Sequence, residues 1–402
     1  MAPISLLSLR CSGVGAISCK KTFWHEYEGY VEMKESIIRS YFMSEPDADA
    51  ADQIILADIS VTTATPELPT PLLTASGALK NASLVLVKVT SKCGTEGHSY
   101  LFSPNAKLLP ALASAVSVAF DEVKGRSCSP ETNTDYLSDK FKLFGGTGIL
   151  TMAFAAIDMA SWDLLGNALR QPLYRLWGGT NTNIPSYESS GLSIGRFSQV
   201  LDQAETFLSN GNSRMKVRLG YETIEEEVEL LSRLKDELGN GVELMVDYNQ
   251  GLTVDQAFER CKELDDLGLA WIEEPILADM LEKAADLTKA TTTPTQLGEN
   301  LWSLIEVERA LNLGASDYLM PDVAKIGGAT QWLRAAKMAE THGIKVSSHL
   351  YPEISAHLLA SVGNAHYLEY ADWTKLLFSG HGSPTNNQVI LSDVSGVGLY
   401  DS

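Results

Sequence analysis

Short apolar runs alternate with helical segments along the second half of the chain. The run KVRLG precedes ETIEEEVELLSRLKDEL, in which Ile224, Val228 and Leu231 share one helical face, and VELMVDY precedes VDQAFERCKELDDLG. The same order continues through TQLGEN, DYLMPD, KVSSHL and HYLEY. These runs are nearly continuously apolar, as is typical of parallel strands that are covered on both faces. The pattern predicts a barrel domain of strands and helices over residues 181–378.

The first part of the chain has strands before helices. Strands are favoured by QIILADISVTT and ASLVLVKVTS, which flank the loop ELPTPLLTASGALK, and residues 105–170 have mainly helical spacing. This order predicts a separate α+β domain over residues 53–180. Residues 1–52 end in the acidic stretch SEPDADAAD and are expected to be an extension outside the core. The glycine-rich residues 379–402 are expected to return to the α+β domain.

Composition excludes several kinds of partner. The chain has 402 residues, more than a single core usually holds, so two domains are expected. It carries 51 acidic and 31 basic residues, and this formal charge of −20 argues against a nucleic-acid partner. No apolar run approaches the ~20 residues needed to cross a bilayer, so no membrane partner is expected.

Cysteine usage favours a reducing compartment. The five cysteines form no CxxC pair and leave an odd one over. A cytoplasmic location is therefore expected. The basic residues Arg10, Lys20 and Lys21 near the start make mitochondrial import the less favoured alternative.

A residue that can do chemistry ends each of seven successive segments. The series is Arg218, Asp247, Glu273, Glu299, Asp322, His349 and Glu369. The gaps between them are 20 to 29 residues, about the length of a strand, a helix and two short loops. A parallel barrel gathers the carboxyl ends of its strands on one face, where the active sites of such barrels lie. The series therefore predicts an enzyme active site.

Three of these residues form a predicted metal site. Asp247, Glu273 and Glu299 are carboxylates on neighbouring strand ends, with no Cys or His among them. Ligand sets made only of oxygen suit a hard divalent cation, and Mg²⁺ is the favoured one. Each residue alone could be a helix cap or a solvated acid. Three carboxylates at matching strand ends favour a metal site.

The next strand ends predict a base and a proton donor. Asp322 beside His349 would fix the tautomer of the imidazole and raise its basicity. Glu369, placed across the barrel mouth from Lys216, could be buried and protonated and so donate to a developing oxyanion. A dication, a base and a proton donor together suit removal of the proton next to a carboxylate through an enediolate.

The motifs resemble those of the enolase superfamily, and specifically its mandelate racemase branch. KVRLGY, MVDYNQ, WIEEP, LGEN, MPDVAKIGG, SSHLYPEISAHLLA and LEY occur in the family's order and at its spacing, over roughly residues 53 to 400. The resemblance implies a (β/α)7–8 TIM-like barrel with an α+β N-terminal capping domain. It also implies a homo-oligomer that acts on a small-molecule carboxylate.

The resemblance implies a role for each matching residue. Mg²⁺ would be bound by Asp247, Glu273 and Glu299. His349 would be a base that Asp322 orients.

Further roles concern the substrate. Glu369 would be the electrophilic acid, and Lys216 would neutralise the substrate carboxylate. Ser189 matches a position that hydrogen-bonds this carboxylate, and Asn249 matches a polar residue near the substrate hydroxyl.

Arg218 departs from the family's KxK motif, which supplies a second lysine base opposite His349. A guanidinium has a pKa above ~12 and does not deprotonate in proteins. One interpretation is a like-charge replacement that leaves weak racemase activity. The other is that Arg218 binds the substrate carboxylate bidentately and leaves His349 as the sole base, which suits elimination of water from an acid sugar.

The loop at residues 68–80 bears on the substrate. By resemblance it closes over the substrate, and Leu72, Leu73 and Leu79 make it apolar, which favours an aryl 2-hydroxy acid. The predicted function is therefore Mg²⁺-dependent α-proton abstraction from a 2-hydroxycarboxylate, as in mandelate racemase. An acid-sugar dehydratase that uses His349 as base is the alternative, and a degenerate, non-catalytic barrel is the second alternative.

Overall fold

The computed structural model describes residues 51–371, 373–375, 377–379 and 382–401. The expectations for residues 1–52 and for an import signal therefore fall almost wholly outside the described residues.

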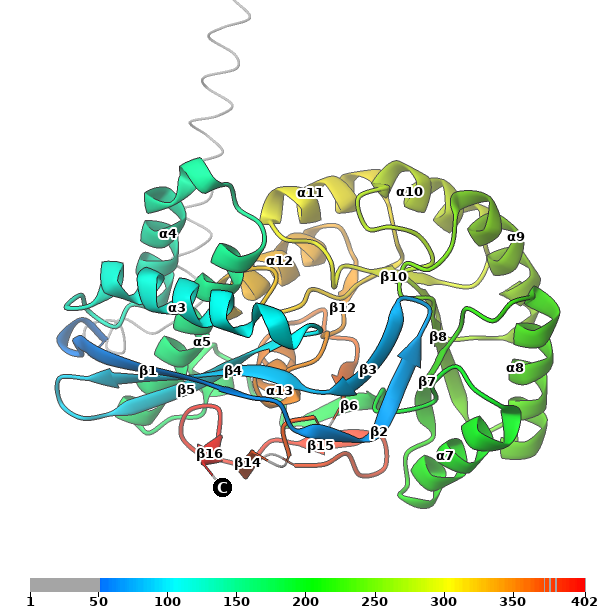
Figure 1. Ribbon diagram of the computed structural model, residues 1–402, viewed down its shortest axis with the longest axis horizontal. Coiled ribbons are helices and arrows are strands. Elements are labelled where there is room, and N and C mark those ends of the chain that lie inside the picture. Colours follow the sequence, from blue (N-terminus) through cyan, green and yellow to red (C-terminus); the bar gives the residue numbers. More distant parts are fainter. Residues whose placement is uncertain (1–50, 372, 376, 380–381, 402) are drawn as a thin grey trace, which may run out of the picture. The chain divides into compact units, whose positions relative to one another are not determined.

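A three-stranded antiparallel sheet begins the described chain (Figure 1). Its strands, in spatial order, are β1 (Leu56–Ala64), β4 (Ser83–Ser91) and β5 (Glu96–Ser103). Burial alternates along the second half of β4, so one face of that strand is turned to a core. Helices α3 (Leu109–Val123) and α5 (Ile149–Leu169) pack against the sheet, and α4 (Pro130–Lys140) packs against these two helices. This is the predicted α+β capping domain.

Helix α5 is the central helix of this domain. It is the one described helix that is long and apolar enough to cross a membrane, but 83% of its apolar window is buried inside the protein. Trp162 of α5 donates from its indole N–H to Thr330 Oγ1 at 3.0 Å, which joins the capping domain to a barrel helix. The length and apolarity of α5 therefore reflect a core position.

The segment expected as a loop between β1 and β4 is a β-hairpin. Strands β2 (Glu67–Thr74) and β3 (Gly77–Asn81) pair antiparallel, and Figure 1 shows them extending toward the barrel strands. The tip is seated on the barrel, because the Ser76 hydroxyl donates to the carbonyl of Asn249. A Cβ atom at Gly251 would overlap the side chain of Ala75 at the same tip. The expected loop was wrong: β2 and β3 pair with each other as a separate two-stranded sheet instead of joining the three-stranded sheet.

Eight parallel strands form the barrel, which confirms the predicted fold class. They are β6 (Asn183–Glu188), β7 (Arg214–Arg218), β8 (Glu243–Asp247), β9 (Ile272–Glu273), β10 (Thr295–Leu297), β11 (Tyr318–Leu319), β12 (Lys345–Val346) and β13 (Leu368–Tyr370). Neighbours in the chain are neighbours in the sheet from β6 to β12. The ring closes because β13 pairs with β6, and Val346 of β12 bridges to Ala365 just before β13.

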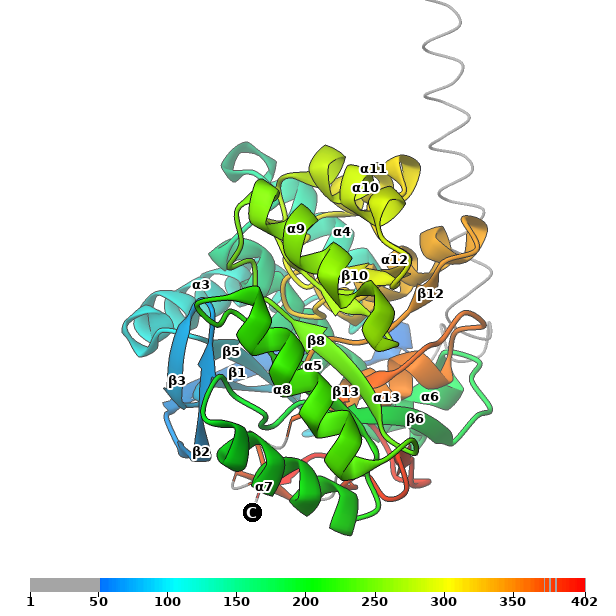
Figure 2. The ribbon, with the colours of Figure 1, turned by 90° about the vertical axis from the view of Figure 1, so that its right-hand side faces the viewer.

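Helices follow seven of these strands and surround the barrel (Figure 2). They are α7 (Phe197–Ser209), α8 (Ile224–Leu238), α9 (Val254–Leu264), α10 (Leu281–Ala290), α11 (Leu304–Leu313), α12 (Ala329–Thr341) and α13 (Pro352–Ala360). Thr223 and Thr253 begin α8 and α9 as N-caps, and each accepts a hydrogen bond from the backbone three residues on. Leu231 and Leu234 of α8 are fully buried against the strands, as their helical spacing predicts.

Short elements complete the fold. They are the helices η1 (Ala106–Leu108), η2 (Lys142–Phe144), α6 (Leu173–Leu176) and η3 (Asp265–Leu267), and the strands β14 (Phe378–Ser379), β15 (Gln388–Ile390) and β16 (Tyr400–Asp401). Strand β15 pairs with β6 of the barrel, whereas the backbone N–H of Val397 donates to Asp163 of α5 at 2.7 Å. The C-terminal segment therefore contacts both the barrel and the capping domain.

Candidate active site at the carboxyl ends of the barrel strands

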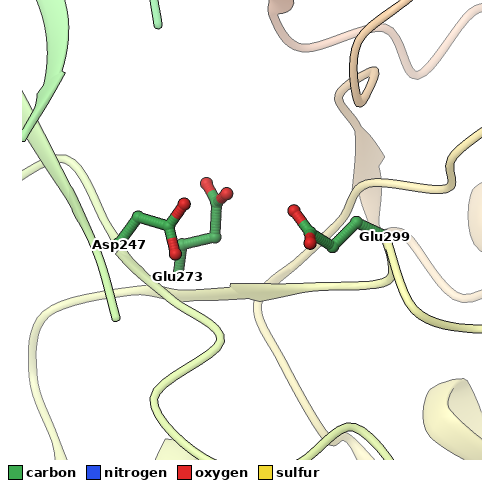
Figure 3. Close-up of side chains that lie close together, drawn as sticks. All are labelled: Asp247, Glu273 and Glu299. Atoms are coloured by element: carbon green, nitrogen blue, oxygen red, sulfur yellow. The ribbon is translucent and has the colours of Figure 1, made fainter. Parts of the chain in front are cut away.

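Three carboxylates converge at the ends of adjacent strands (Figure 3). Asp247 and Glu273 are the last residues of β8 and β9 and are paired in register, and Glu299 follows β10 by two residues. One oxygen atom of each lies within 4.8 Å of those of the other two, and all three side chains are buried. Gly298, at φ +135°, permits a close approach to the Met320 backbone that leaves no room for a Cβ. A glycine at position 298 therefore allows the backbone conformation that leads into Glu299.

The electrostatics of this cluster suit a divalent cation. Burial raises the pKa of Glu273 to about 8, although Lys216 opposes the shift, and the charges of Asp247 and Glu369 act with burial. Like charges held this close in a buried site disfavour one another unless a cation offsets them. The donor set contains only carboxylate oxygens, so it fits Mg²⁺.

The predicted base is in place beside these carboxylates. His349 Nδ1 lies 2.6 Å from Asp322 Oδ2, and the two residues form a parallel β-bridge. Asp322 is itself fixed by backbone N–H groups, since its Oδ1 accepts from Ala324 and Lys325 at 2.8 Å. The other ring nitrogen of His349, Nε2, lies 3.1 Å from Glu299 Oε2.

The charges around His349 set its protonation. Burial alone would lower its pKa, but Glu299 and Glu369 attract a proton and Asp322 hydrogen-bonds the ring, so the pKa is held well above its ordinary value. A dication on the three carboxylates would act in the opposite direction on this imidazole.

Glu369 and Lys216 are in direct contact, which corrects the expected placement across the barrel mouth. Lys216 Nζ lies 2.7 Å from Glu369 Oε1 and 3.2 Å from Asp247 Oδ2, and it also pairs with Glu273. The reason is topological: β13 and β7 lie on either side of β6, so Glu369 and Lys216 are only two strands apart. Lys216 is 1% exposed and is not among the described residues that line the cavity below.

The charges around Glu369 favour its ionised form, whereas the sequence led us to expect a protonated carboxyl. Burial opposes ionisation, but the positive charges of Lys216, His349 and Arg218 together lower the pKa of Glu369 to about 2. Its two oxygens accept from the Ser189 hydroxyl at 2.7 Å and from the Leu350 backbone N–H at 2.8 Å. Ser189 therefore contacts the predicted acid directly.

Arg218 is held in an ion pair. Its Nη1 pairs with Asp247 Oδ2, and its Nη2 donates to Ser189 Oγ at 2.8 Å. Its Nε is buried and has no hydrogen-bond partner among the described residues. The same holds for Oδ1 of Asn249, whose Nδ2 donates to Asp247 Oδ2 at 3.0 Å. Buried polar atoms left without a partner are commonly completed by a ligand or by water.

A cavity of about 570 Å³ opens over these residues. Its charged lining comes from the barrel ends: Arg218, Glu299, Asp322, Lys325, His349 and Glu369. Its other wall is apolar and comes largely from the capping domain, with Phe102, Leu112 and Met152 among its residues. Sequence reasoning missed these three. Their spacing marked core positions of helices and strands, and nothing in it shows which of them face a cavity.

A second cavity, of about 680 Å³, lies between α7 and the C-terminal segment. It contains none of the residues predicted for catalysis, so it is not the candidate active site.

Comparison with known families agrees with this architecture. Residues 58–178 match the model of the mandelate racemase / muconate lactonizing enzyme N-terminal domain, and residues 199–400 match the enolase C-terminal domain-like model. The chain belongs to the mandelate racemase / muconate lactonizing enzyme family. It is thus an enzyme of the enolase superfamily, as the motifs indicated.

Two curated relatives are bacterial enzymes. A 3,6-anhydro-α-L-galactonate cycloisomerase of Streptomyces coelicolor is 30% identical over 311 residues, which cover 75% of this chain and 84% of the relative. An L-talarate/galactarate dehydratase of Salmonella typhimurium is 28% identical, over 80% of this chain and 81% of the relative. Membership of the family therefore leaves more than one reaction class open.

Solved structures of family members carry magnesium. A Bradyrhizobium enolase in complex with magnesium and mandelic acid is 32% identical and has a TM-score of 0.82, over 86% of this chain and 96% of that one. The Salmonella dehydratase with magnesium and L-lyxarohydroxamate is 27% identical and has a TM-score of 0.83, over 88% and 92%. Mg²⁺ as the family's cofactor is confirmed.

Proposed function

We propose that the chain removes the α-proton of a 2-hydroxycarboxylate with His349 as its only base, and that the resulting enediolate loses a β-hydroxyl group. The reaction is then a dehydration that yields a 2-oxo acid. Arg218 carries the proposal, because it occupies the position from which a second base would act.

Asp247, Glu273 and Glu299 would hold the Mg²⁺ ion. When bound there, Mg²⁺ supplies Lewis-acid stabilisation of the negative charge that develops on the substrate carboxylate.

His349 takes the proton at Nε2. Asp322 holds Nδ1 at 2.6 Å, which fixes the tautomer and the ring orientation. Nε2 then carries the free lone pair, and His349 lines the cavity in which the substrate would lie. The imidazolium that forms is the proton source for the departing hydroxyl group.

Glu369 is the proposed proton donor to the enediolate. Its cationic neighbours favour the ionised form, but a substrate carboxylate placed beside it would add a like charge and so raise its pKa. The Ser189 hydroxyl and the Leu350 N–H then hold its two oxygens in a fixed orientation.

Arg218 cannot serve as the second base. Its guanidinium is paired with Asp247, and the ordinary pKa of a guanidinium is so high that no neutral form exists at physiological pH. Burial opposes the charge, but Asp247 and Glu369 raise the pKa of Arg218 further. Racemisation needs a base on each face of the α-carbon, whereas elimination needs one. The unpartnered Nε is free to donate to a substrate carboxylate.

A second candidate is racemisation of an aryl 2-hydroxy acid. The apolar cavity wall favours it, and the solved Bradyrhizobium relative carries mandelic acid. In this case Arg218 would limit the rate. We continue to expect a homo-oligomer in the cytoplasm for either reaction.

The test is formation of a 2-oxo acid from 2,3-dihydroxycarboxylates in the presence of Mg²⁺, followed as the semicarbazone. We expect turnover by the wild type and a loss of about 10³-fold in His349→Asn, because general-base catalysis contributes roughly 10²–10⁴-fold. His342→Asn, at an exposed position after α12, is the matched control. Undiminished turnover in His349→Asn would refute the role of His349, and racemisation without any 2-oxo acid would favour the second candidate.

A further inference from the structure

The active-site cavity has two chemically different walls. The charged wall is built at the barrel ends. The opposite wall includes Phe102 of β5, Leu112 of α3, and Ile149 and Met152 of α5, with Leu79 of the hairpin and Trp373 beyond β13. No charged side chain among the described lining residues comes from that wall.

The hydroxyl groups of Thr74, Ser76 and Ser103 on the apolar wall each donate to a backbone carbonyl. Thr74 Oγ1 donates to the Gly77 carbonyl at 3.1 Å and accepts from the Ser76 N–H at 3.2 Å. The Ser76 hydroxyl donates to the Asn249 carbonyl. The Ser103 hydroxyl donates to the Asn105 carbonyl at 3.0 Å and accepts from the Asn105 N–H at 3.3 Å. The protons of these three hydroxyls are thus used within the protein, so a ligand hydroxyl that entered here would find only acceptor lone pairs on them.

The buried lining atoms without partners lie at the charged wall instead. Among the described lining residues these atoms are Arg218 Nε and Asn249 Oδ1. One is a donor suited to a carboxylate, and the other is an acceptor suited to a hydroxyl. Polar recognition is therefore concentrated on the carboxylate end of the substrate.

The apolar wall begins close to the base. Leu350 and Tyr351 directly follow His349 and line the same cavity. The Tyr351 hydroxyl accepts from the Phe102 backbone N–H at 2.9 Å, and the Phe102 ring lies 5.0 Å from that of Trp373. An aromatic wall thus lines the same cavity as His349, and we place the C3 substituent of the substrate against it.

We infer that the substrate is a 2,3-dihydroxycarboxylate with an aryl or branched alkyl group on C3. This inference rests on the proposed function. His349 breaks the C2–H bond and takes its proton, the C3–O bond breaks, and the hydroxyl leaves as water with that proton. The enol that remains takes up a proton at C3 and becomes the 2-oxo acid. An acid sugar would place its outer hydroxyls on the apolar wall.

The test compares three substrates with the wild-type enzyme and Mg²⁺. Glycerate has both hydroxyls and no substituent, 2,3-dihydroxy-3-phenylpropanoate adds an apolar ring, and galactonate adds polar carbons. The readouts are 2-oxo acid formation and incorporation of deuterium at C2 in D₂O. We expect kcat/KM for the phenyl substrate to exceed that for glycerate by about 100-fold, since one methylene in an apolar pocket is worth roughly 10–200-fold.

The two readouts separate the two levels of the claim. Galactonate turned over as fast as the phenyl substrate, or faster, would overturn the inference and leave the proposed function intact. Absence of both 2-oxo acid formation and exchange at C2 with all three substrates would overturn the proposed function and the inference with it.

A matched pair of variants tests whether the apolar wall causes the preference for the phenyl substrate. Met152→Gln puts an amide of similar size into the wall, whereas Met152→Leu keeps the wall apolar. The ratio of kcat/KM for the phenyl substrate to that for glycerate should fall at least 10-fold in Met152→Gln and stay within about 3-fold in Met152→Leu. Equal ratios in the two variants would contradict the inference.

Discussion

Arg218 forms an ion pair with Asp247, the carboxylate that ends the neighbouring strand. The guanidinium therefore lies at the proposed metal site and is linked through Ser189 to Glu369. A lysine in its place could lose a proton, but the arginine stays charged. Under the proposed function, His349 is therefore the only base.

Magnesium binding should depend on the three converging carboxylates. Glu299→Gln should weaken Mg²⁺ binding at least 100-fold in a calorimetric titration, because it removes a charged ligand. Glu243→Gln, at the opposite end of β8 from Asp247, is the control and should bind like the wild type. Mg²⁺ should also raise the Tm of the wild type, since a ligand that binds only the folded state stabilises it. Absence of any site-specific Mg²⁺ binding would favour the non-catalytic barrel.

The Tyr351 hydroxyl should position the base. Leu350 and Tyr351 both have left-handed backbone angles, at φ 50° and 48°, directly after His349, a conformation that costs about 1–3 kcal/mol per residue. The hydrogen bond from Phe102 and stacking on Tyr100 at 4.9 Å hold this turn. Tyr351→Phe should lower kcat about 10-fold and leave Mg²⁺ binding unchanged.

Tyr318→Phe, which removes a phenol hydroxyl on β11, is the matched control for Tyr351→Phe. A kcat for Tyr351→Phe equal to that of this control would show that the hydroxyl does not position His349.

The contact between the hairpin tip and the barrel should be needed for full activity. In Gly251→Ala the new methyl group would overlap Ala75, so the hairpin should be displaced and kcat/KM should fall about 10-fold. The double variant Gly251→Ala with Ala75→Gly removes the overlap and should recover most of the loss. A double variant as impaired as Gly251→Ala would show that the overlap is not the cause.

Stability should depend on pH through Glu131 at the start of α4. Burial raises its pKa to about 7, and one of its oxygens has no partner among the described residues. The folded state thus holds the proton more tightly than the unfolded chain. The contribution of Glu131 to stability is fully present below the unfolded pKa, near 4.5, and is lost as the pH rises to about 7.

Glu131→Gln should therefore reduce the fall in the free energy of unfolding between pH 5 and pH 7.5. The expected reduction is on the order of 2 kcal/mol, measured by urea denaturation. Glu225→Gln, at an exposed position in α8, should leave that fall unchanged. An identical pH dependence in Glu131→Gln and the wild type would contradict the burial argument.

Much of the site could be predicted because a parallel barrel converts spacing into position. Asp247 and Glu273 end adjacent strands, and His349 and Asp322 form a β-bridge. The spacing of the strands was therefore enough to predict that these residues lie close together. The contact between Lys216 and Glu369 could not be predicted in this way. It depends on closure of the ring through β6, which periodicity does not encode.

The charge state of Glu369 and the apolar wall were also beyond sequence reasoning. The ionisation of Glu369 depends on how close three cations lie, and that distance is set by tertiary packing. Phe102 and Met152 are more than 150 residues from His349 in the chain, and helices α3 and α5 present their lining residues only after the two domains meet.

The role of His349 as the only base is most directly tested by exchange of the α-proton in D₂O. The two enantiomers of a 2-hydroxy acid with an apolar substituent, such as mandelate, are incubated separately with Mg²⁺ and followed by NMR. We predict that the wild type exchanges one enantiomer at least 100-fold faster than the other, and that Arg218→Lys gains exchange of the slower one while Arg218→Gln does not. Comparable exchange of both enantiomers by the wild type would contradict it.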